Sequence, residues 1–274
     1  MSSTNPFNIN RLNSALFICL LMLGSLLDAA EKQKMIVGDF SQQETTLPAS
    51  WDALTFASIE EHTSYTLVDD ENIKVIKAQS NESASGLTRK ISFNPKEYPY
   101  LSWRWKVNKA IPGTDVTSKS GDDYAARIYV MFKYNLEDLS EDEQSRISWY
   151  KFFNGKLPPL ATLNYIWANK MPLGRIVSSP YTERVKMVIL KNKSSELQQW
   201  HVEERNIYED YKKAFGEEPK DVISIAIMTD TDNTEAMAES YFGDIVVSKV
   251  RTLKPPLTQT STTQKIQLGK TSLE

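Results

Sequence analysis

The chain is poor in residues that carry covalent catalysis or bind soft metals. Among 274 residues it has one cysteine, Cys19, and two histidines, His62 and His201. Cys19 lies inside an apolar N-terminal run, so a chain processed after that run would have no thiol. Disulfides, thiol catalysis and cysteine-ligated metals are then excluded. The sequence also lacks a G-x-S-x-G motif and a glycine-rich phosphate loop, which argues against a serine triad and a nucleotide site.

Charge of one sign and long hydrophobic runs are also missing. The formal net charge is −3 and no long run of like charge stands out, so neither nucleic acid nor an anionic membrane is indicated as a partner. The longest apolar stretch, Ser14–Leu27, is short for a membrane span, which needs about 20 residues. It follows a polar segment with Arg11 and precedes the small residues Asp28-Ala29-Ala30. This order predicts a signal peptide over residues 1–30 and a periplasmic or secreted protein with no membrane segment after cleavage. The alternative is an uncleaved N-terminal anchor.

The rest of the chain shows strand patterning. From Ile36 onward, short runs of alternating apolar and polar residues are separated by polar turns, which is typical of β-strands. Asp69-Asp70-Glu71-Asn72 indicates a hairpin turn. The candidate strands are Ile36–Phe40, Ser64–Val68, Ile73–Ala78, Gly86–Ile91, Tyr100–Val107, Tyr124–Tyr134, Ala161–Ala168, Arg184–Lys191, Gln198–Glu204, Val222–Asp230 and Tyr241–Val250.

Two helices interrupt the strands. The capping-box order Ser140-Glu141-Asp142-Glu143 leads into a helix over Ser145–Phe153. Asn206 is placed to cap a second helix, Ile207–Phe215, which Gly216 would end. Every fourth residue of this second helix is apolar or aromatic from its first position on, so one face is expected to pack on the sandwich.

The elements together predict the fold class. Strands outnumber helices and do not alternate with them in βαβ order, which favours an all-β, antiparallel β-sandwich of the jelly-roll kind with two short peripheral helices. Residues 31–253 are expected to form a single β-sandwich domain. The Thr-, Ser- and Gln-rich residues 254–274 have too little apolar content to pack and are predicted to be a disordered tail.

Strand alternation also assigns side chains to faces. In Tyr100–Val107, Trp103 and Trp105 share the apolar side and are expected in the core, whereas Arg104 points the other way. In Tyr124–Tyr134, Arg127 and Tyr129 lie on the polar side. If the two strands are neighbours, these three polar side chains form a groove for a polar or acidic ligand. The alternative is a solvated face covered by long side chains.

Further candidate ligand residues lie at strand ends and in the loops beside this face. A loop at the edge of a sandwich can hold a ligand or can be a plain connector, and the sequence leaves both readings open. The candidates at the rim are Asp122, Asp123, Asn164, Trp167 and Arg175.

Two groups of carboxylates are candidate metal ligands. Asp230 and Asp232 belong to an acidic D-x-D-N loop that follows a strand and offers the hard oxygens that Ca²⁺ takes, although capping of a turn would explain them too. Asp39 and Asp244 lie in strands near the two ends of the domain, and in many sandwiches such strands meet. They are a second candidate metal pair.

Several motifs in one order resemble the bacterial DUF3047 family. They are Pro99–Lys106, Gly121–Val130, Leu163–Trp167, Ile227–Thr234 and Tyr241–Ile245. The resemblance covers about Val37–Val250. It implies an exported protein with a layout similar to the galactose-binding-like jelly roll of many carbohydrate-binding modules. It brings no catalytic residue, because the family is a domain of unknown function.

Three functions remain open at this level. The first hypothesis is an exported, non-catalytic binding protein whose ligand is a glycan or another polyhydroxylated or acidic molecule, held on a concave sheet face. No cofactor is required for it, apart from the Ca²⁺ that the acidic loop allows. The second is a hydrolase or lyase acting on a cell-envelope polysaccharide, with Asp122, Asp123, Asp230 and Asp232 supplying acid, base or metal ligation. The third is a structural envelope protein.

Overall fold

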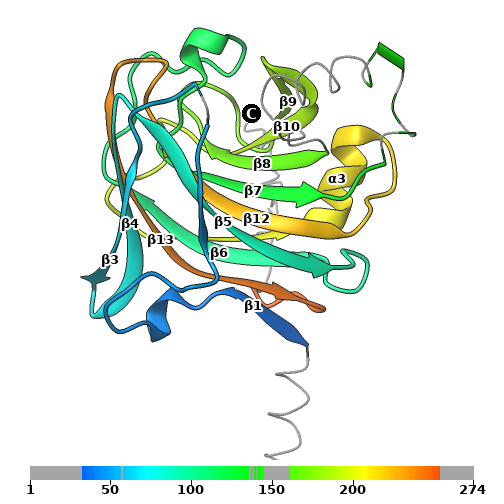
Figure 1. Ribbon diagram of the computed structural model, residues 1–274, viewed down its shortest axis with the longest axis horizontal. Helices are drawn as coiled ribbons and strands as arrows, with labels where there is room; N and C mark the ends of the chain where they lie inside the picture. The colour runs from blue at the N-terminus through cyan, green and yellow to red at the C-terminus, as the bar shows by residue number, and fades with distance from the viewer. Residues whose placement is uncertain are drawn as a thin grey trace, which may run out of the picture.

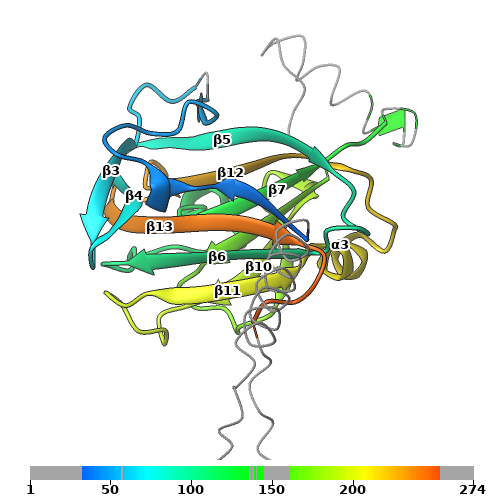
Figure 2. The same ribbon diagram turned by 90° about the horizontal axis from the view of Figure 1, so that it is seen from below.

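Two β-sheets packed face to face form the molecule (Figure 1 and Figure 2). The computed structural model describes residues 33–253, except 57, 136, 138, 140, 143 and 145–160. The predicted signal peptide (1–30), the helix over Ser145–Phe153 and the tail (254–274) lie outside the described residues. The prediction of an all-β sandwich of the jelly-roll kind is confirmed.

The first sheet, sheet A, has the strand order β11-β6-β13-β4-β3. All its pairs are antiparallel. The long strand β13 pairs with β4 over its first half, and β1 takes the place beside its second half. The strands of sheet A are β1 (Lys34–Gly38), β3 (Ser64–Asp70), β4 (Ile73–Asn81), β6 (Tyr100–Val107), β11 (His201–Asn206) and β13 (Met237–Ser248).

The second sheet, sheet B, has the order β2-β5-β12-β7-β8-β10-β9. It corrects the prediction in one respect, because β8 and β10 pair in parallel. The chain leaves β8, takes the edge position as β9, and returns as β10 into the space between them, so β10 runs in the direction of β8. The strands of sheet B are β2 (Asp52–Leu54), β5 (Ala84–Phe93), β7 (Arg127–Phe132), β8 (Thr162–Trp167), β9 (Ile176–Ser179), β10 (Thr182–Lys191) and β12 (Val222–Asp230).

The core lies between the two sheets and follows the predicted alternation. On β6 the side chains of Trp103 and Trp105 are buried, and their rings meet edge to face at 5.5 Å. Tyr165 of β8 approaches Trp103 from the opposite sheet, with ring centroids 5.3 Å apart. Each such buried aromatic side chain contributes about 1.5–3 kcal/mol through removal of apolar surface from water. The expectation that these tryptophans belong to the core is confirmed.

One α-helix, α3 (Ile207–Phe215), closes one end of the sandwich (Figure 1). The predicted cap is present, since Asn206 Oδ1 accepts a hydrogen bond from the Glu209 main-chain N–H at 3.0 Å. Gly216 ends the helix with a φ of 75°, which a side chain would disfavour. Two short 3₁₀ turns, η1 (Phe40–Gln42) and η2 (Lys119–Gly121), lie in loops. Within the described part of the chain, no helix is both long and apolar enough to cross a membrane.

Candidate functional site

Arg104 and Arg127 do not share a surface, contrary to the sequence-based expectation. Arg104 lies on β6 of sheet A and Arg127 on β7 of sheet B, and each points away from the core between the sheets. β6 pairs with β11 and β13, whereas β7 pairs with β12 and β8. The predicted groove that joins the two arginines is therefore wrong, because strands that follow one another in sequence enter different layers.

Arg104 lies flat on an aromatic side chain on the outer face of sheet A. Its guanidinium carbon is 4.3 Å from the centre of the Trp200 ring. Gly243 on the neighbouring strand makes room, because a Cβ at that position would lie 2.5 Å from the Arg104 Cγ and Nε atoms. Among the described residues no carboxylate or carbonyl accepts a hydrogen bond from this guanidinium.

Arg127, in contrast, uses all of its N–H groups. Its Nε donates to Asp230 Oδ1 at 2.7 Å, and its Nη2 donates to Asp230 Oδ2 and to the Asp122 main-chain oxygen. Its Nη1 donates to the Tyr129 hydroxyl at 3.1 Å and lies 3.5 Å from Asp122 Oδ2. The side chain is buried, and its ring neighbour is Tyr124 at 4.3 Å. Arg127 thus holds a buried acidic group and has no donor left for a ligand.

The loop before β7 brings two aspartates to the end of β12. A Cβ on Gly121 would lie 2.6 Å from the Asp115 main-chain nitrogen, so glycine is needed where the loop crosses itself. Asp122 and Asp123 follow directly. The loop is then fastened to Asp230, because the Tyr124 N–H donates to Asp230 Oδ1 at 3.3 Å and the Asp230 N–H donates to the Tyr124 carbonyl at 3.3 Å.

Asp123 also fixes the acidic loop after β12. Its carboxylate accepts hydrogen bonds from the Asn233 N–H at 3.2 Å, the Thr234 N–H at 2.7 Å and the Thr234 hydroxyl at 2.6 Å. As a result, one carboxylate oxygen each of Asp123, Asp230 and Asp232 lies within 4.8 Å of the others. With Asp122, these three residues form what we call the carboxylate cluster. Four of the predicted acidic residues are brought together here.

The carboxylate cluster contains more acidic groups than basic groups. Arg127 is the cation bonded to it, so its four carboxylates outnumber the guanidinium. Burial raises the pKa of Asp122, Asp230 and Asp232, and the neighbouring carboxylates add to this effect, although Arg127 lowers all three pKa values. Burial by itself lowers the pKa of Arg127, but Asp230 together with Tyr129, Asp122 and Tyr124 outweighs this effect, and the pKa lies above its ordinary value. Asp122 Oδ1 is buried, and the neighbouring Tyr124 hydroxyl, which is also buried, lowers the pKa of this carboxyl group.

An exposed aromatic ring that the sequence did not single out borders the cluster. Tyr181, in the turn between β9 and β10, is 55% exposed, and its hydroxyl lies 3.4 Å from the Lys119 carbonyl oxygen. Lys119 Nζ lies 5.2 Å from the centre of the Tyr181 ring. Burial raises the pKa of the phenol, and the Asp122 and Asp232 carboxylates raise it further, which reflects their proximity. Its signal in the sequence is a tyrosine directly after Pro180 in a polar loop.

The other predicted rim residues have different positions. Asn164 lies on the outer face of β8, opposite Tyr129 of β7, and is 1% exposed with its Oδ1 unpaired. The prediction that Trp167 contacts a ligand at the rim is wrong. Its ring lies in the core, 6.0 Å from the ring of Trp105, and cannot contact a ligand at the surface. Arg175 is exposed beyond the edge of β10, where its carbonyl accepts the Ile189 N–H at 3.0 Å. It is separated from Arg127 by two strands.

Of the second predicted metal pair, Asp244 lies on β13 as expected, but Asp39 follows the last residue of β1, the strand that pairs with β13, and caps the turn η1. The Asp244 carboxylate accepts hydrogen bonds from the Ser41 N–H at 2.8 Å and from the Ser41 hydroxyl at 2.5 Å. Both of its oxygens therefore hold the turn η1. A metal at this pair stays a prediction.

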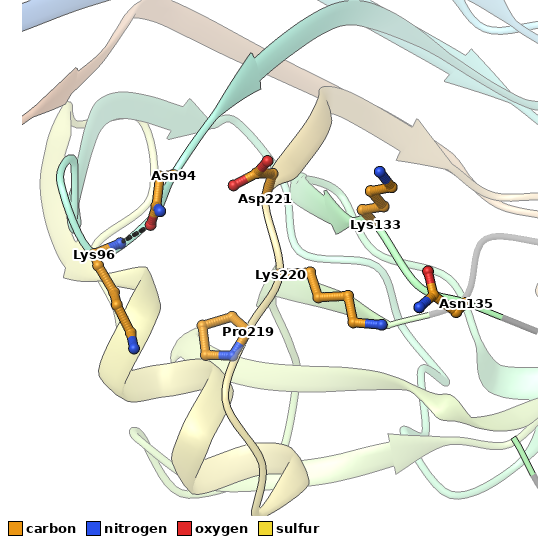
Figure 3. A pocket seen from close by; sticks show the side chains of 7 residues that line it. All are labelled: Asn94, Lys96, Lys133, Asn135, Pro219, Lys220 and Asp221. Atoms are coloured by element: carbon orange, nitrogen blue, oxygen red, sulfur yellow. Dashed lines mark hydrogen bonds between the residues drawn. The ribbon is translucent and has the colours of Figure 1, made fainter. Parts of the chain in front are cut away.

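An open pocket of about 420 Å³ lies at the other end of β12 (Figure 3). Asp221 precedes the first residue of β12 and Asp230 is its last, so the pocket is about 30 Å from the carboxylate cluster at ~3.3 Å per residue. Its lining is polar: Asn94, Lys96, Lys133, Asn135, Pro219, Lys220 and Asp221. Lys96 is ion-paired with Glu218 at 3.2 Å. We place the candidate site at the cluster instead, because carboxylates from two loops converge there beside an exposed aromatic ring.

Comparison with solved structures gives distant similarities of the β-sandwich. The first is to the glycoside hydrolase domain of Endo-D from Streptococcus pneumoniae R6, with 11% identity and a TM-score of 0.30 over 75% of this chain, which spans 22% of that one. The second is to the Emp47p carbohydrate recognition domain, with 11% identity and a TM-score of 0.40 over 80% of this chain and 98% of that one.

A third similarity is to endoglucanase 3 of family GH12 from Trichoderma harzianum, with 7% identity and a TM-score of 0.35, over 73% of this chain and 98% of that one. Similarity at this level does not bear on function. No relative was found among curated proteins.

The family assignment comes from the sequence. Residues 49–246 match the family model described as a protein of unknown function, DUF3047. The match includes the two loops that carry the carboxylate cluster and Tyr181. It begins after Asp39, so the first residues of the expected resemblance lie outside it. The chain therefore belongs to the DUF3047 family.

Proposed function

We propose that this protein is a non-catalytic binding protein for a glycan, and that the ligand lies on the surface formed by Asp122, Tyr181, Asp232 and Asn233. We call these four residues the loop-end surface. The observation that carries the proposal is an aromatic ring, 55% exposed, beside the half-buried carboxylate of Asp232.

The chemistry of these side chains suits a polyhydroxylated ligand. A sugar ring has an apolar face that packs on an aromatic ring, and Tyr181 offers such a ring with its polar end already held at Lys119. Sugar hydroxyls donate to carboxylates in short, strong hydrogen bonds. Asp232 is half-buried, and its Oδ2 receives a long contact of 3.4 Å from the Asn233 amide, so it keeps acceptor capacity for a ligand.

The burial of the acids favours binding over hydrolysis. A glycosidase needs two carboxyl groups that reach the bond to be broken. Asp123 is 0% exposed and Asp230 is 2% exposed, and both are already engaged by the loop and by Arg127. Of the three aspartates whose oxygens converge, only Asp232 reaches the surface. A single accessible carboxylate fits recognition of a hydroxyl group better than acid–base catalysis.

The proposed site of action is the periplasm or the exterior of the cell, on the basis of the signal-peptide pattern in residues 1–30. Mass spectrometry of protein recovered from a native host's periplasm or medium tests this. We expect the N-terminus of the processed chain to lie close to Ala30. Recovery of chains that begin at Met1 from the cytosolic fraction contradicts an exported role.

The test of binding uses an array of bacterial cell-envelope glycans followed by calorimetry with the best glycan. We expect Tyr181→Ala to weaken binding about tenfold, which corresponds to ~1.4 kcal/mol, the order expected of one aromatic contact. Tyr208→Ala is a matched control, because that tyrosine on α3 also has a lysine near its ring, Lys212 at 5.1 Å, but lies at the other end of the sandwich.

Three results contradict the proposal. One is that no glycan of the array binds, and another is that Tyr181→Ala and Tyr208→Ala weaken binding equally. The third is release of reducing ends from a polymer by the wild type, which Asp232→Asn abolishes, because it makes the protein a hydrolase.

A further inference from the structure

We propose that Arg104 binds an acidic group of a ligand on the outer face of sheet A, and that this group is a carboxylate or a phosphate. The site belongs to the other sheet from the one that carries the loop-end surface. It is tested with acidic compounds and their neutral counterpart, so its outcome does not depend on the proposed function.

The side chain of Arg104 is held in one orientation by its neighbours. The strands β13, β6 and β11 lie side by side in sheet A (Figure 2), and Arg104 lies on the middle strand of the three. Its Cγ and Nε atoms fill the space that a Cβ at Gly243 of β13 would take, at 2.5 Å. Its guanidinium carbon lies 4.3 Å from the centre of the ring of Trp200, the residue before β11. Because the side chain is already ordered, binding of a ligand costs it little further conformational entropy.

The ring beneath the guanidinium is fixed as well. The Trp200 Nε1–H donates to Asp70 Oδ2 at 2.8 Å, and the ring centre lies 6.5 Å from that of Tyr241. The N–H bonds of a guanidinium lie in its own plane, so a ring stacked on one face leaves its five donors available. Trp200 therefore orients Arg104 without using its hydrogen-bonding capacity.

The donors of Arg104 have no acceptor in the described part of the chain, although the side chain is half-buried. Two other partly or fully buried arginines differ in this respect, since Arg127 donates to Asp230 and Arg205 donates to Asp210. A guanidinium that has lost part of its hydration gains most from an acceptor that is itself charged and takes two parallel N–H bonds. An oxyanion of a ligand would supply such an acceptor.

The charges around Arg104 also favour an anion. Two acids of this face are each matched by a lysine, because Lys106 Nζ lies 2.5 Å from Asp70 Oδ2 and Lys77 Nζ lies 2.8 Å from Glu239 Oε2. Arg104 is the positive charge that these pairs leave over. Lys106 also lies near the same aromatic ring, with its Nζ 5.3 Å from the ring centre of Trp200. An anion bound to the guanidinium is therefore attracted by a second cation as well.

The shape of the donor group and its apolar neighbour indicate the class of ligand. A guanidinium presents its donors as a planar fork, which matches the oxygens of a carboxylate or a phosphate. Val202 lies opposite Arg104 on β11 and is 56% exposed, so apolar surface borders the charged group. An acidic sugar or a phosphate ester offers both an oxyanion for the fork and C–H groups for the apolar surface.

The experiment is calorimetric titration of the full chain at low ionic strength with three tetramers. Tetragalacturonate carries carboxylates, a glycerol phosphate tetramer carries phosphates, and a galactose tetramer is neutral. We expect one acidic tetramer to bind about tenfold more tightly than the neutral one, and the tighter of the two identifies the acidic group. Added NaCl should weaken this binding. Equal affinity for acidic and neutral tetramers, or no binding of either acidic tetramer, overturns the proposal with the wild type alone.

Two variants of Arg104 then locate the site. Arg104→Ala should weaken binding of the acidic tetramer about tenfold, the order expected of one charged bidentate contact. Arg104→Lys should recover only part of this loss, because an ammonium group does not bind an oxyanion as a fork. Melting temperatures close to that of the wild type show that both variants are folded.

Arg251→Ala is the matched control. Arg251 also lies over an aromatic ring, with its guanidinium carbon 5.8 Å from the centre of Tyr100, but its Nε is already paired with Glu204 Oε1 at 3.1 Å. It should leave binding of the acidic tetramer unchanged. Full binding in Arg104→Ala overturns the proposal, and so does an equal loss in Arg104→Ala and Arg251→Ala. A loss in Tyr181→Ala without one in Arg104→Ala also overturns it, because the acidic tetramer then lies on the loop-end surface.

Discussion

Two arginines on the two sheets of this sandwich differ in burial and in hydrogen bonding. Arg127 of sheet B is buried and donates to Asp230, Asp122 and Tyr129. Arg104 of sheet A is half-buried, rests on Trp200 and has no acceptor among the described residues. The first is a structural residue that holds buried acids in place, and the second is held by packing. A charged residue on a polar strand face is therefore not by itself a ligand contact, and its hydrogen bonds decide its role.

The largest expected difference between the two arginines is in the unfolding free energy that is lost when each is replaced. Arg127→Ala leaves the Asp230 carboxylate buried without its partner, which should cost about 3–5 kcal/mol of unfolding free energy. Chemical denaturation by urea measures this change. Arg127→Lys should recover only part of the loss, because an ammonium group cannot donate as a fork to both oxygens of Asp230. A loss below about 1 kcal/mol in Arg127→Ala would show that the network contributes little.

The glycine that shapes the acidic loop should have the next largest effect. In Gly121→Ala the new methyl group meets the Asp115 main-chain nitrogen at 2.6 Å, and backbone cannot move aside as easily as a side chain. We expect a loss of about 2 kcal/mol. Gly243→Ala is the matched comparison on the other layer, because there the obstacle is the flexible Arg104 side chain. It should cost less than half as much, and equal losses in urea titrations would contradict this reasoning.

The two layers should also differ in the sign of their pH dependence. Burial raises the pKa of Asp122, Asp230 and Asp232 above the unfolded value of about 4, so the folded protein binds protons there more tightly. Stability from the cluster is then lost as pH rises through the raised pKa values and recovered as pH falls. We expect a higher melting temperature near pH 5 than near pH 7, and a smaller difference in Asp232→Asn.

Glu239 in sheet A provides the contrasting case. Burial opposes its ionisation, but the interactions with Lys77, Tyr241 and Asn108 together outweigh this and lower its pKa. Its contribution to stability is present above the unfolded pKa and is lost as pH falls through the folded value. Glu239→Gln should therefore leave the difference between pH 5 and pH 7 unchanged. A melting temperature that falls from pH 7 to pH 5 in both variants and in the wild type would contradict the assignment of the raised pKa values.

The smallest effect is expected at Arg104. Removal of its stacking on Trp200 in Arg104→Ala should cost about 0.5–1 kcal/mol, as for a partly exposed cation above an aromatic ring. The variant should shift tryptophan fluorescence and leave glycan binding at the loop-end surface unchanged. A loss of glycan binding in Arg104→Ala with full binding in Tyr181→Ala would move the site to sheet A.

Much of the fold follows from local sequence patterns. The alternation in Tyr100–Val107 placed Trp103 and Trp105 in the core, and the strand bounds are the ones predicted. The bounds and the cap of α3 also follow the sequence, because Asn206 and Gly216 act through contacts within a few residues. Such features need only the chain neighbours of a residue, which makes them accessible without a structure.

The arrangement of strands was not accessible in the same way. Which strand lies beside β6 depends on long-range pairing, and the sequence carries no local sign of it. The strand β9 was missed for a different reason, because its four half-buried residues show no alternation of apolar and polar side chains. Trp167 was wrongly predicted at the rim, because a tryptophan near a loop can lie either in a core or on a rim and the sequence does not distinguish the two. The sequence named Asp122, Asp123, Asp230 and Asp232 as candidates but did not indicate that their loops meet, and Tyr181 joins them only through the turn between β9 and β10.

The loop that carries Asp232 links the two sheets. It connects β12, an interior strand of sheet B, with β13, an interior strand of sheet A. A ligand that immobilises this connection therefore restrains both layers at one point. Amide hydrogen exchange should slow in β5 and β7 as well as in β4 and β6 on occupancy, although none of these four strands needs to contact the bound group.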